Sequence, residues 1–343
     1  MASENNSHKK AVAAIIGPTA TGKSEIALAV AAALKGEIIS VDSVQVYRGM
    51  DIGTAKLLPQ ERVGPDGKPI RHHMLDIVDP DQPFSVADYQ RMARDIIDTI
   101  HRRGNLPLLV GGTGLYYQAV VDPYFFTAMP ANSETRQQLV ALARKYGNNY
   151  LHERLQTVDP EAARRIHPND RRRLVRALET YILTGRPIST ALLLRRQQEP
   201  PYRLAAIGLT MPRQELYQRI EERVDKMIAQ GLVAEVRQLL KQYDYYLPAL
   251  QALGYREIGA YLRGETSFEE AVVLLKRNTR RLAKRQLTWF RRDQRIFWLE
   301  LEGKKKGEIT TFIIDYFREQ LLLGQNKVIL KTKNASLEGK KNE

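Results

Sequence analysis

The sequence predicts an α/β fold in which a parallel sheet is flanked by helices and a helical segment is inserted between two parts of the core. Apolar runs of strand length, such as 12–16 and 37–41, alternate with stretches of helical character. A glycine-rich loop separates the first run from the first helix. This alternation stops near residue 122 and resumes at 203. The expected division is 10–121 and 203–323 for the core, 122–202 for the insertion, and 324–343 for a polar, disordered tail.

The composition is that of a globular protein without sulfur chemistry. At 343 residues the chain is long for one compact core, and a hydrophobic content of 43% supplies enough apolar side chains for a sizeable one. The longest apolar run, 26–34, is too short to cross a bilayer, and the polar N-terminus shows no cleavable signal pattern. The absence of cysteine excludes disulfides, thiolate zinc sites and cysteine nucleophiles, and fits a cytoplasmic protein.

The charge balance indicates a polyanionic partner. Lysine and arginine number 53 against 39 acidic residues, which gives a net charge of +14 and a pI near 9.8. Nucleic acid is the commonest partner of such a chain. A basic but merely solvated surface is the alternative, so the positions of the charges must decide.

The loop at 17–24 has the spacing Gly-x4-Gly-Lys-Ser between a strand and a helix. Gly17 and Gly22 allow backbone N–H groups to point inward around phosphate oxygens, and the start of the following helix adds to this attraction. Lys23 supplies a positive charge, and the Ser24 hydroxyl suits a phosphate-bound Mg²⁺. A glycine turn beside an incidental lysine is the alternative. The pattern predicts a core similar to that of the P-loop NTPases, binding a diphosphate or a triphosphate.

Two further candidate residues follow strands. The second strand ends at Asp42, and ligands gather at the carboxyl ends of parallel strands. Asp42 is therefore a candidate Mg²⁺ ligand or general base, with a turn or helix-capping aspartate as the alternative. The third strand, 106–110, is followed by Gly111, Gly112 and Thr113, where a motor NTPase would have an acid. Small residues there let a bulky group approach, although a tight turn into the next helix explains them equally well.

The remaining elements follow from periodicity and breakers. A capping box at Ser85–Asp88 starts a helix to about Arg103, whereas 43–68 is mostly irregular and rich in glycine and proline. The other expected helices are 133–146, 150–158, 171–184, 214–230, 267–292 and 308–323, and the other expected strands are 203–209 and 295–299.

Arginines concentrate in the insertion and in the long helix at 267–292. Clusters at a helix start serve phosphate backbones better than they serve solubility, with a solvated face as the alternative. The segment 253–256 pairs Tyr255 with Arg256, a combination that can stack on bases. The cations of the insertion are Arg164, Arg165, Arg171, Arg172, Arg173, Arg176, Arg195 and Arg196, and those of the long helix include Arg277, Arg280, Arg281, Lys284, Arg285, Arg291 and Arg292.

Several separated motifs together resemble the tRNA dimethylallyltransferase family. They span roughly 12–299, and their combination is far more specific than the phosphate loop alone. Thr21 and Ser24 stand where many members have serine and threonine, and both exchanges keep a hydroxyl group. Because the chain has no cysteine for a C-terminal zinc finger, it resembles the bacterial type. The motifs are Gly17–Ser24, Ser40–Ser43, Tyr47–Lys56, Leu75–Pro80, Val110–Thr113, His167–Asp170, Leu253–Arg256 and Ala283–Trp289.

The resemblance implies transfer of a dimethylallyl group from dimethylallyl diphosphate to the exocyclic N6 amine of the adenosine just 3′ of the tRNA anticodon. Lys23, Arg223 and a Ser24-bound Mg²⁺ would take up the charge of the leaving diphosphate. Asp42 would accept a proton or a hydrogen bond from the amine, and Thr19 and Thr113 would orient the substrates. The implied diphosphate-binding residues are Gly17, Pro18, Thr19, Ala20, Thr21, Gly22, Lys23 and Ser24.

The same resemblance implies a monomer in which the insertion grips the anticodon stem-loop while the adenosine is extruded from its stack. The implied tRNA contacts are Asp42, Ser43, Val44, Gln45, Thr113, Arg136, Arg172, Arg173, Leu174, Val175, Arg176, Gln251, Ala252, Leu253, Gly254, Tyr255 and Arg256. Two other interpretations remain open at this point. One is a P-loop kinase that phosphorylates a nucleoside or an RNA, and the other is a noncatalytic RNA-binding NTPase switch.

Overall fold

The computed structural model describes residues 9–124, 133–190, 193 and 197–322. The chain divides into two compact units. One, here unit 1, comprises the residues up to Val121 together with those from Tyr202 onward, and the other, unit 2, is Asp122–Pro201. The tail expected to be disordered at 324–343, and Arg195 and Arg196 of the insertion, lie outside the described residues.

Unit 1 is built on one six-stranded sheet with the strand order β3-β2-β4-β1-β5-β6. Every pairing is parallel, so all carboxyl ends of the strands lie along one edge of the sheet. The predicted α/β class, with a parallel sheet flanked by helices, is confirmed. The strands are β1 (Ala11–Ile16), β2 (Gly36–Val41), β3 (His72–His73), β4 (Leu106–Gly111), β5 (Arg203–Thr210) and β6 (Ile296–Glu300).

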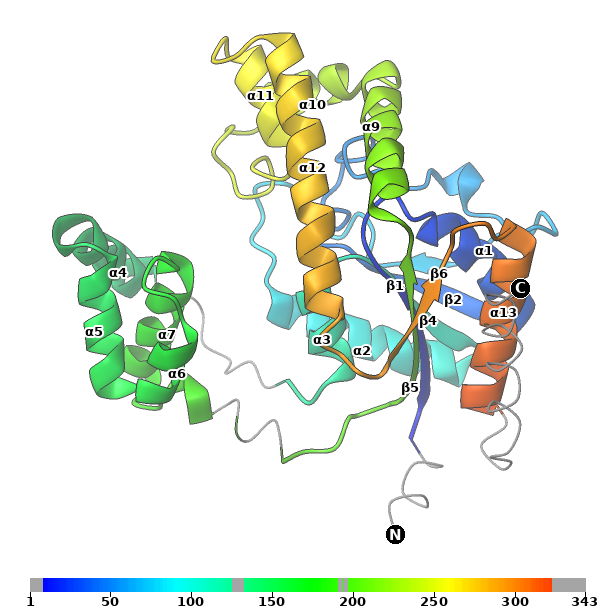
Figure 1. Cartoon of the computed structure of the whole chain (residues 1–343), viewed down its shortest axis with the longest axis horizontal. Helices are drawn as coiled ribbons and strands as arrows, with labels where there is room; N and C mark the ends of the chain where they lie inside the picture. Colours follow the sequence, from blue (N-terminus) through cyan, green and yellow to red (C-terminus); the bar gives the residue numbers. More distant parts are fainter. Residues whose placement is uncertain (1–8, 125–132, 191–192, 194–196, 323–343) are drawn as a thin grey trace, which may run out of the picture. The chain divides into compact units, whose positions relative to one another are not determined.

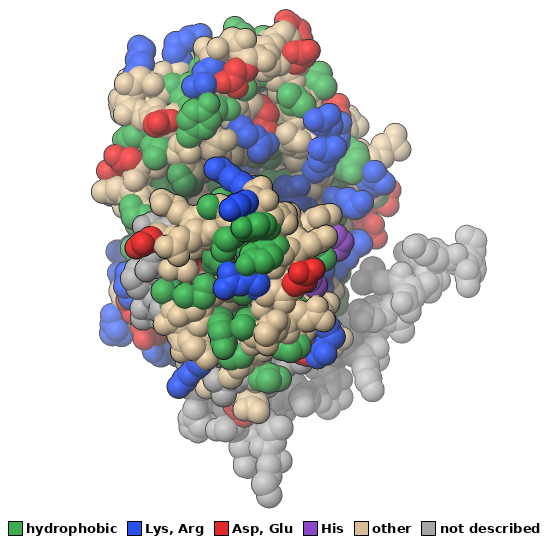
Figure 2. All heavy atoms as spheres, turned by 90° about the vertical axis from the view of Figure 1, so that its left-hand side faces the viewer, with side chains coloured by type: hydrophobic (Ala, Val, Ile, Leu, Met, Phe, Trp, Pro, Cys, Tyr) green, Lys and Arg blue, Asp and Glu red, His purple; other side chains and the backbone are tan. Residues whose placement is uncertain are grey.

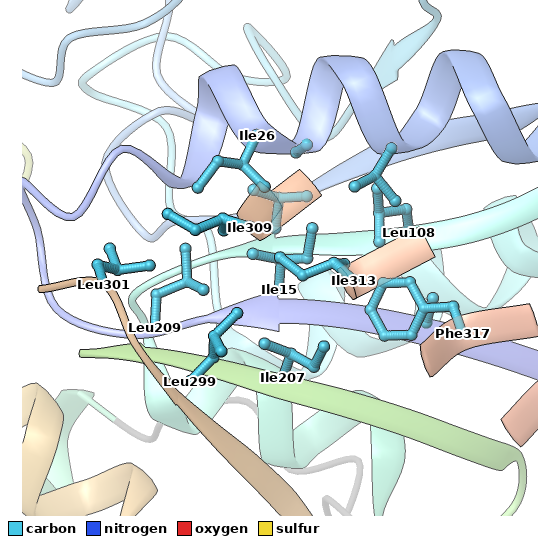
Figure 3. Packing of buried hydrophobic residues seen from close by; sticks show 14 of the residues in the cluster. Ile15, Ile26, Leu108, Ile207, Leu209, Leu299, Leu301, Ile309, Ile313 and Phe317 are labelled. Atoms are coloured by element: carbon cyan, nitrogen blue, oxygen red, sulfur yellow. The ribbon is translucent and has the colours of Figure 1, made fainter. Parts of the chain in front are cut away.

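Helices cover both faces of this sheet (Figure 1). On one face α1 (Lys23–Leu34) and α13 (Lys306–Phe317) pack on alternate residues of β1, β4 and β5. Figure 3 shows this layer, with Ile15 and Ile207 of the strands facing Ile309, Ile313 and Phe317. On the other face α2 (Val86–Arg102) and α3 (Gly114–Val121) bury their apolar sides. The expected capping box is confirmed, because the Ser85 hydroxyl accepts from the Asp88 amide.

A group of helices around a separate apolar cluster completes unit 1. It contains α9 (Arg213–Ala229), α10 (Leu232–Leu240), α11 (Tyr255–Leu262) and α12 (Phe268–Phe290), which pack with Met50 from the loop after β2. That loop is irregular as expected, apart from a single 3₁₀ turn, η1 (Pro59–Glu61). The final helix was expected over 308–323, but α13 ends at Phe317 and a π-helical turn, η2 (Arg318–Leu322), follows.

Unit 2 is a small helical bundle with a core of its own. Its helices are α4 (Ser133–Tyr146), α5 (Asn148–Val158), α6 (Pro160–Arg165) and α7 (Arg171–Thr184). Leu139, Leu151, Leu155, Leu174 and Leu178 are buried together between them. In the part of the chain that the structure describes, no helix combines the length and the apolar character needed to cross a bilayer.

Candidate active site

The phosphate loop joins β1 to α1 at the carboxyl edge of the sheet. Gly17 has a φ of +143°, and a Cβ added there would lie 2.6 Å from the carbonyl oxygen of Leu209 on β5. Only glycine therefore fits at this point, because the loop passes directly against the neighbouring strand. Gly22 is the N-cap of α1 in a left-handed conformation, so Lys23 and Ser24 occupy the first turn of the helix. The loop thus meets a helix N-terminus, the arrangement that attracts phosphate.

The side-chain amine of Lys23 is held against the backbone of the phosphate loop. Its Nζ donates to the carbonyl oxygen of Pro18 at 2.5 Å, and the Thr21 hydroxyl donates to the same oxygen at 3.0 Å. Burial of the amine, with a smaller contribution from the charge of Arg223, lowers the pKa of Lys23 to about 7, whereas Asp42 pulls it upward. The charge of Asp42 therefore does not fully offset the effect of burial on Lys23. A bound diphosphate would supply further negative charge beside the amine.

Asp42 follows β2 and serves two purposes. Its Oδ1 accepts from the amide of Val44 at 2.8 Å and from that of Gln45 at 3.3 Å, so it is a turn aspartate, as the alternative interpretation held. Its negative charge also raises the pKa of both Lys23 and Arg223 against the effect of burial. The carboxylate therefore lies within electrostatic reach of two cations while its position is fixed by backbone donors.

Thr113 ties the ends of two strands together. Its amide donates to the carbonyl of Val41 at 3.0 Å, and its hydroxyl oxygen accepts from the amide of Ser43 at 3.1 Å. α3 begins at the next residue, so the glycines and Thr113 do form a tight turn into a helix. The same turn places Thr113 beside the segment that carries Asp42.

Arg223 reaches the site from α9. Burial lowers the pKa of its guanidinium, and the Asp42 carboxylate opposes that shift. Its Nη2 donates to the carbonyl of Thr54 at 3.4 Å, and Gln45 Nε2 donates to the same carbonyl at 3.3 Å. The structure thus brings the four predicted catalytic residues, Lys23, Asp42, Thr113 and Arg223, to one end of unit 1.

Glu235 on α10 was not singled out from the sequence. Its carboxylate accepts the three consecutive amides of Asp51, Ile52 and Gly53 at 3.1, 2.7 and 3.1 Å. It also accepts the hydroxyl of Tyr255 at 2.7 Å. These contacts fix the turn whose next residue, Thr54, supplies the carbonyl for Arg223. No local pattern signals the role, because the three amides lie more than 180 residues away in the chain.

Gln286 on α12 is the second residue that sequence reasoning missed. Its Oε1 accepts from the amide of Thr19 at 2.9 Å, and its Nε2 donates to the carbonyl of Gly112 at 3.0 Å. One side-chain amide thus bridges the phosphate loop and the turn before Thr113. The residue lies within the motif Ala283–Trp289, which was the only available signal, and that motif gave no indication of its role.

The expected stacking of Tyr255 on bases is wrong. Its side chain is 1% exposed, and its hydroxyl is bonded to Glu235. A Cβ on Gly53 would lie 2.6 Å from the ring, so the tyrosine is part of the packing around the turn at 51–53. Within the same segment Arg256 is exposed, and it pairs with Glu257 at 2.5 Å. Gln251, Ala252 and Leu253 are only partly exposed, and Gly254 is buried.

The expected tRNA contacts in unit 2 divide into two groups. Leu174 and Val175 are 0% and 5% exposed in the helical core, so their side chains are not available to RNA. Arg172 is exposed. The other arginines are paired: Arg173 with Asp170 at 3.4 Å, and Arg136 and Arg176 with the buried Glu179 at 2.8 and 3.1 Å.

The residues present fit a Mg²⁺ ion only in company with a phosphate ligand. Ser24 is exposed in the first turn of α1, and its hydroxyl has no hydrogen-bond partner among the described residues. The part of the chain that the structure describes holds no group of three histidine or acidic side chains able to hold a metal. Mg²⁺ is commonly held by one or two protein oxygens together with substrate phosphates and water. Ser24 suits that kind of site.

The glycine-bounded loop, its lysine and the neighbouring carboxylate, at the carboxyl edge of a parallel sheet, define a protein with a core like that of the P-loop NTPases. Comparison with protein families identifies a more specific group within that class. A model described as IPP transferase matches residues 45–293, and one described as isopentenyl transferase matches residues 10–65. The chain belongs to the tRNA dimethylallyltransferase family and is therefore a transferase, so the kinase interpretation is not favoured.

Individual relatives match this chain over at least 80% of their own lengths. The tRNA dimethylallyltransferase of Moorella thermoacetica is 69% identical, covering 90% of this chain and 96% of the relative. That of Carboxydothermus hydrogenoformans is 52% identical over 88% and 95%. The tRNA isopentenylpyrophosphate transferase structure from Bacillus halodurans has a TM-score of 0.66 at 45% identity and covers 92% and 99%. A eukaryotic dimethylallyltransferase described as acting on tRNA has a TM-score of 0.76 at 27% identity, covering 90% and 80%.

Proposed function

We propose that this chain transfers the dimethylallyl group of dimethylallyl diphosphate to the exocyclic N6 amine of the adenosine 3′-adjacent to the anticodon, releasing diphosphate. The observation that carries the proposal is the grouping of Asp42 with Lys23 and Arg223 beside the phosphate loop. The cations suit a leaving group that gains negative charge, and the carboxylate suits an amine that must lose a proton.

The reaction needs one bond to form and one to break. The lone pair of the N6 amine bonds to the first carbon of the dimethylallyl group, while the bond from that carbon to oxygen breaks and its electron pair leaves with the diphosphate. One amine proton passes to the Asp42 carboxylate. Lys23 and Arg223 stabilise the developing charge on the departing oxygen, and the burial of their charged groups strengthens that interaction.

The loop from Gly17 to Ser24 binds the diphosphate through its backbone amides and the start of α1. Ser24 would hold a Mg²⁺ ion, which supplies further positive charge to the diphosphate oxygens. Ser43, Val44 and Gln45 follow Asp42 in the chain, and Thr113 is hydrogen-bonded to Ser43. These four residues would contact the adenosine. Arg172 and Arg256 are exposed and suit the tRNA backbone. A monomeric enzyme of the cytoplasm is part of the same proposal.

Mass spectrometry of the nucleosides tests the proposal directly. After the protein is incubated with tRNA, Mg²⁺ and dimethylallyl diphosphate, we expect one adenosine per acceptor tRNA to gain the mass of a dimethylallyl group. A transcript with guanosine at that position is the matched control and should gain nothing. Label transfer from ATP to RNA, with none from labelled dimethylallyl diphosphate, would overturn the proposal in favour of a kinase.

A further inference from the structure

The inner side of α12 packs against the turn that carries Thr113. On the outer surface, Figure 2 shows hydrophobic, basic and acidic side chains mixed together on the face that it presents. The contacts inside unit 1 are more specific. The amide of Gln286 lies against Gly112, and the indole of Trp289, three residues further along the same side of the helix, lies against Gly114. Because the two glycines flank Thr113, side chains of α12 meet the backbone on both sides of that threonine.

These contacts, and not the backbone conformation, account for the two glycines. Neither Gly112 nor Gly114 has a φ in the left-handed range that favours glycine. A Cβ added to Gly114 would lie 2.6 Å from both Cγ and Nε1 of Trp289, and one added to Gly112 would collide with the amide of Gln286. The sequence predicts that small residues at this position admit a bulky group, and two side chains of α12 occupy that space.

The contact of Trp289 with Gly114 depends on shape. The indole Nε1 is buried and has no hydrogen-bond partner among the described residues, so packing, and not a polar bond, fixes the ring. The next residue, Phe290, is 1% exposed, and its ring meets that of Tyr117 edge-on with the centroids 5.8 Å apart. This end of α12 is therefore held firmly against α3.

The position of the Thr113 hydroxyl depends on how the turn is held. Its oxygen accepts from the amide of Ser43 at 3.1 Å, and the Thr113 amide donates to the carbonyl of Val41 at 3.0 Å. Both partners belong to β2 and the loop that follows it, whereas Trp289 supports the turn from α12. If the turn moved into the space of a missing indole, the bond to Ser43 would lengthen and the hydroxyl would leave the segment that carries Asp42.

We infer that Trp289 is a positioning residue for Thr113. By filling the space next to Gly114, its ring keeps the threonine hydroxyl beside the segment that carries Asp42, where the amine of the adenosine would bind. The inference rests on the proposed function, because that function gives Thr113 its contact with the adenosine. In this role Trp289 touches neither substrate and acts through the backbone of the turn at 112–114.

Substitution of the ring tests whether its shape matters. Trp289→Ala should lower the single-turnover rate of prenyl transfer by about 10- to 100-fold, since a misplacement of about 1 Å can cost 10²-fold. The Kd values for tRNA and for dimethylallyl diphosphate should change only a few-fold. Trp289→Phe keeps an aromatic ring and loses an N–H group that has no partner among the described residues, so it should retain most of the rate.

The matched control is the other tryptophan of the chain. Trp298 on β6 also packs on a glycine, since a Cβ added to Gly208 of β5 would lie 2.8 Å from its ring. Trp298→Ala should lower the unfolding temperature through lost packing and leave the single-turnover rate within a few-fold of that of the unaltered enzyme.

Two double substitutions show whether the ring acts on the turn. Gly114→Ala alone should slow transfer at least as much as Trp289→Ala, because the new methyl group collides with the indole. Adding Trp289→Ala removes the collision and should bring the rate back to that of Trp289→Ala alone, since residues in contact have non-additive effects. In a Thr113→Ala background, Trp289→Ala should cause little further loss, because the hydroxyl that the ring positions is absent.

Independent effects would overturn the inference. These are a Gly114→Ala rate that Trp289→Ala lowers further, or the same loss from Trp289→Ala with and without the Thr113 hydroxyl. A normal rate for Trp289→Ala, or a Trp289→Phe variant as slow as Trp289→Ala, would also overturn it. If Gly114→Ala does not fold, the phenylalanine variant and the Thr113 background still decide the outcome.

Unfolding temperatures separate this inference from the proposed function. They report the contact between Trp289 and Gly114 in the same set of variants without any reaction. Failure of the unaltered enzyme to prenylate tRNA would refute the proposed function, and coupling between the two residues would still appear in the unfolding temperatures. Normal prenylation by the unaltered enzyme, with no coupling between Trp289 and Gly114 in rate or stability, would overturn the inference alone.

Discussion

At the scale of single residues, substitution of Asp42 is the most direct test of the proposed proton acceptor. Asp42→Asn keeps a side-chain oxygen for the Val44 amide, so the turn should persist while the proton acceptor is lost. We expect the single-turnover rate of prenyl transfer to fall by about 10²–10⁴-fold, because that is the usual contribution of a well-placed base. The Kd for tRNA should change only a few-fold.

The control for this substitution is Asp81→Asn, which alters an exposed aspartate in the loop before α2. Its rate should equal that of the unaltered enzyme. If Asp42→Asn retained more than a tenth of the normal rate, or weakened tRNA binding as much as it slowed the reaction, the residue would be a turn aspartate alone.

Lys23 makes diphosphate binding depend on pH. Because burial lowers its pKa to about 7 in the empty site, the amine is mostly neutral at pH 8 and must regain a proton when a diphosphate binds. Above pH 7 we expect the affinity for dimethylallyl diphosphate to approach a tenfold loss per pH unit, with uptake of nearly one proton. Calorimetry in buffers with different heats of ionisation measures that uptake.

The stability of the ligand-free protein should change in the opposite direction. Unfolded Lys23 keeps its ordinary pKa of 10.5, so between about pH 7 and pH 10.5 the unfolded chain binds more protons at this position than the folded chain. The residue therefore makes the empty enzyme more stable as pH rises through that range. Lys23→Arg, which stays charged, is the control. Equal proton uptake by the Lys23→Arg variant and the unaltered enzyme when dimethylallyl diphosphate binds would show that only the ligand titrates.

At the scale of elements, Gln286 joins α12 to both the phosphate loop and the turn after β4. Gln286→Ala removes two hydrogen bonds, and we expect binding of dimethylallyl diphosphate to weaken by roughly tenfold as the loop loses its support. Gln286→Glu keeps the acceptor for Thr19, but it faces the Gly112 carbonyl with an oxygen and adds negative charge beside the loop. It should therefore bind more weakly still.

Titration calorimetry with dimethylallyl diphosphate compares these variants. Gln294→Ala, an exposed glutamine just beyond the same helix, is the control and should bind normally. Normal binding by Gln286→Glu would contradict the bridging role, since that variant cannot donate to Gly112.

Element by element, the sequence predicted what depends on local pattern. The spacing of Gly17–Ser24 and the apolar runs around it place the loop, β1 and α1 correctly, because each of these is determined by neighbours in the chain. β3 was missed because two residues, His72 and His73, show no periodicity. The short helices α10 and α11 were missed as well, although Leu232, Val236 and Leu239 of α10 do follow a helical spacing.

The residues that support the site escaped prediction because their contacts are distant in the chain. Glu235 accepts hydrogen bonds from a turn 182–184 residues earlier in the chain, and Gln286 accepts one from the phosphate loop 267 residues earlier. Tyr255 beside Arg256 looks like a base-stacking pair in the sequence. Only the fold reveals that Gly53 leaves room for the ring and that Glu235 bonds its hydroxyl. A single sequence shows which residues are adjacent in the chain, whereas packing in the folded protein determines which of their side chains face solvent.

At the scale of the whole molecule, the two units have separate cores, and Glu179 belongs to that of unit 2. Its side chain is 0% exposed, and its Oε2 accepts from both Arg136 and Arg176. Replacing both arginines by glutamine leaves a buried carboxylate without a cation. Removing the partner of a buried charge costs about 3–5 kcal/mol, so we expect unit 2 to unfold at a lower temperature.

Calorimetry should show this as a separate transition that moves downward, while unit 1 keeps its own transition and its affinity for dimethylallyl diphosphate. The control replaces Arg164 and Arg165, whose partner Glu161 is partly exposed, and it should cost less than about 1 kcal/mol. A single transition that moves as a whole would contradict the independence of the two units.

A third variant separates the two possible roles of these arginines. Adding Glu179→Leu to the double substitution removes the unpaired charge and should restore most of the lost stability, because apolar replacement of a buried ion pair is often neutral or favourable. If Arg136 and Arg176 serve only to neutralise Glu179, tRNA affinity should return together with stability. If they also bind phosphate, as the family resemblance implies, the triple variant should be stable and still bind tRNA weakly. Measuring both quantities on the same variant therefore distinguishes an arginine that holds the bundle together from one that holds the RNA.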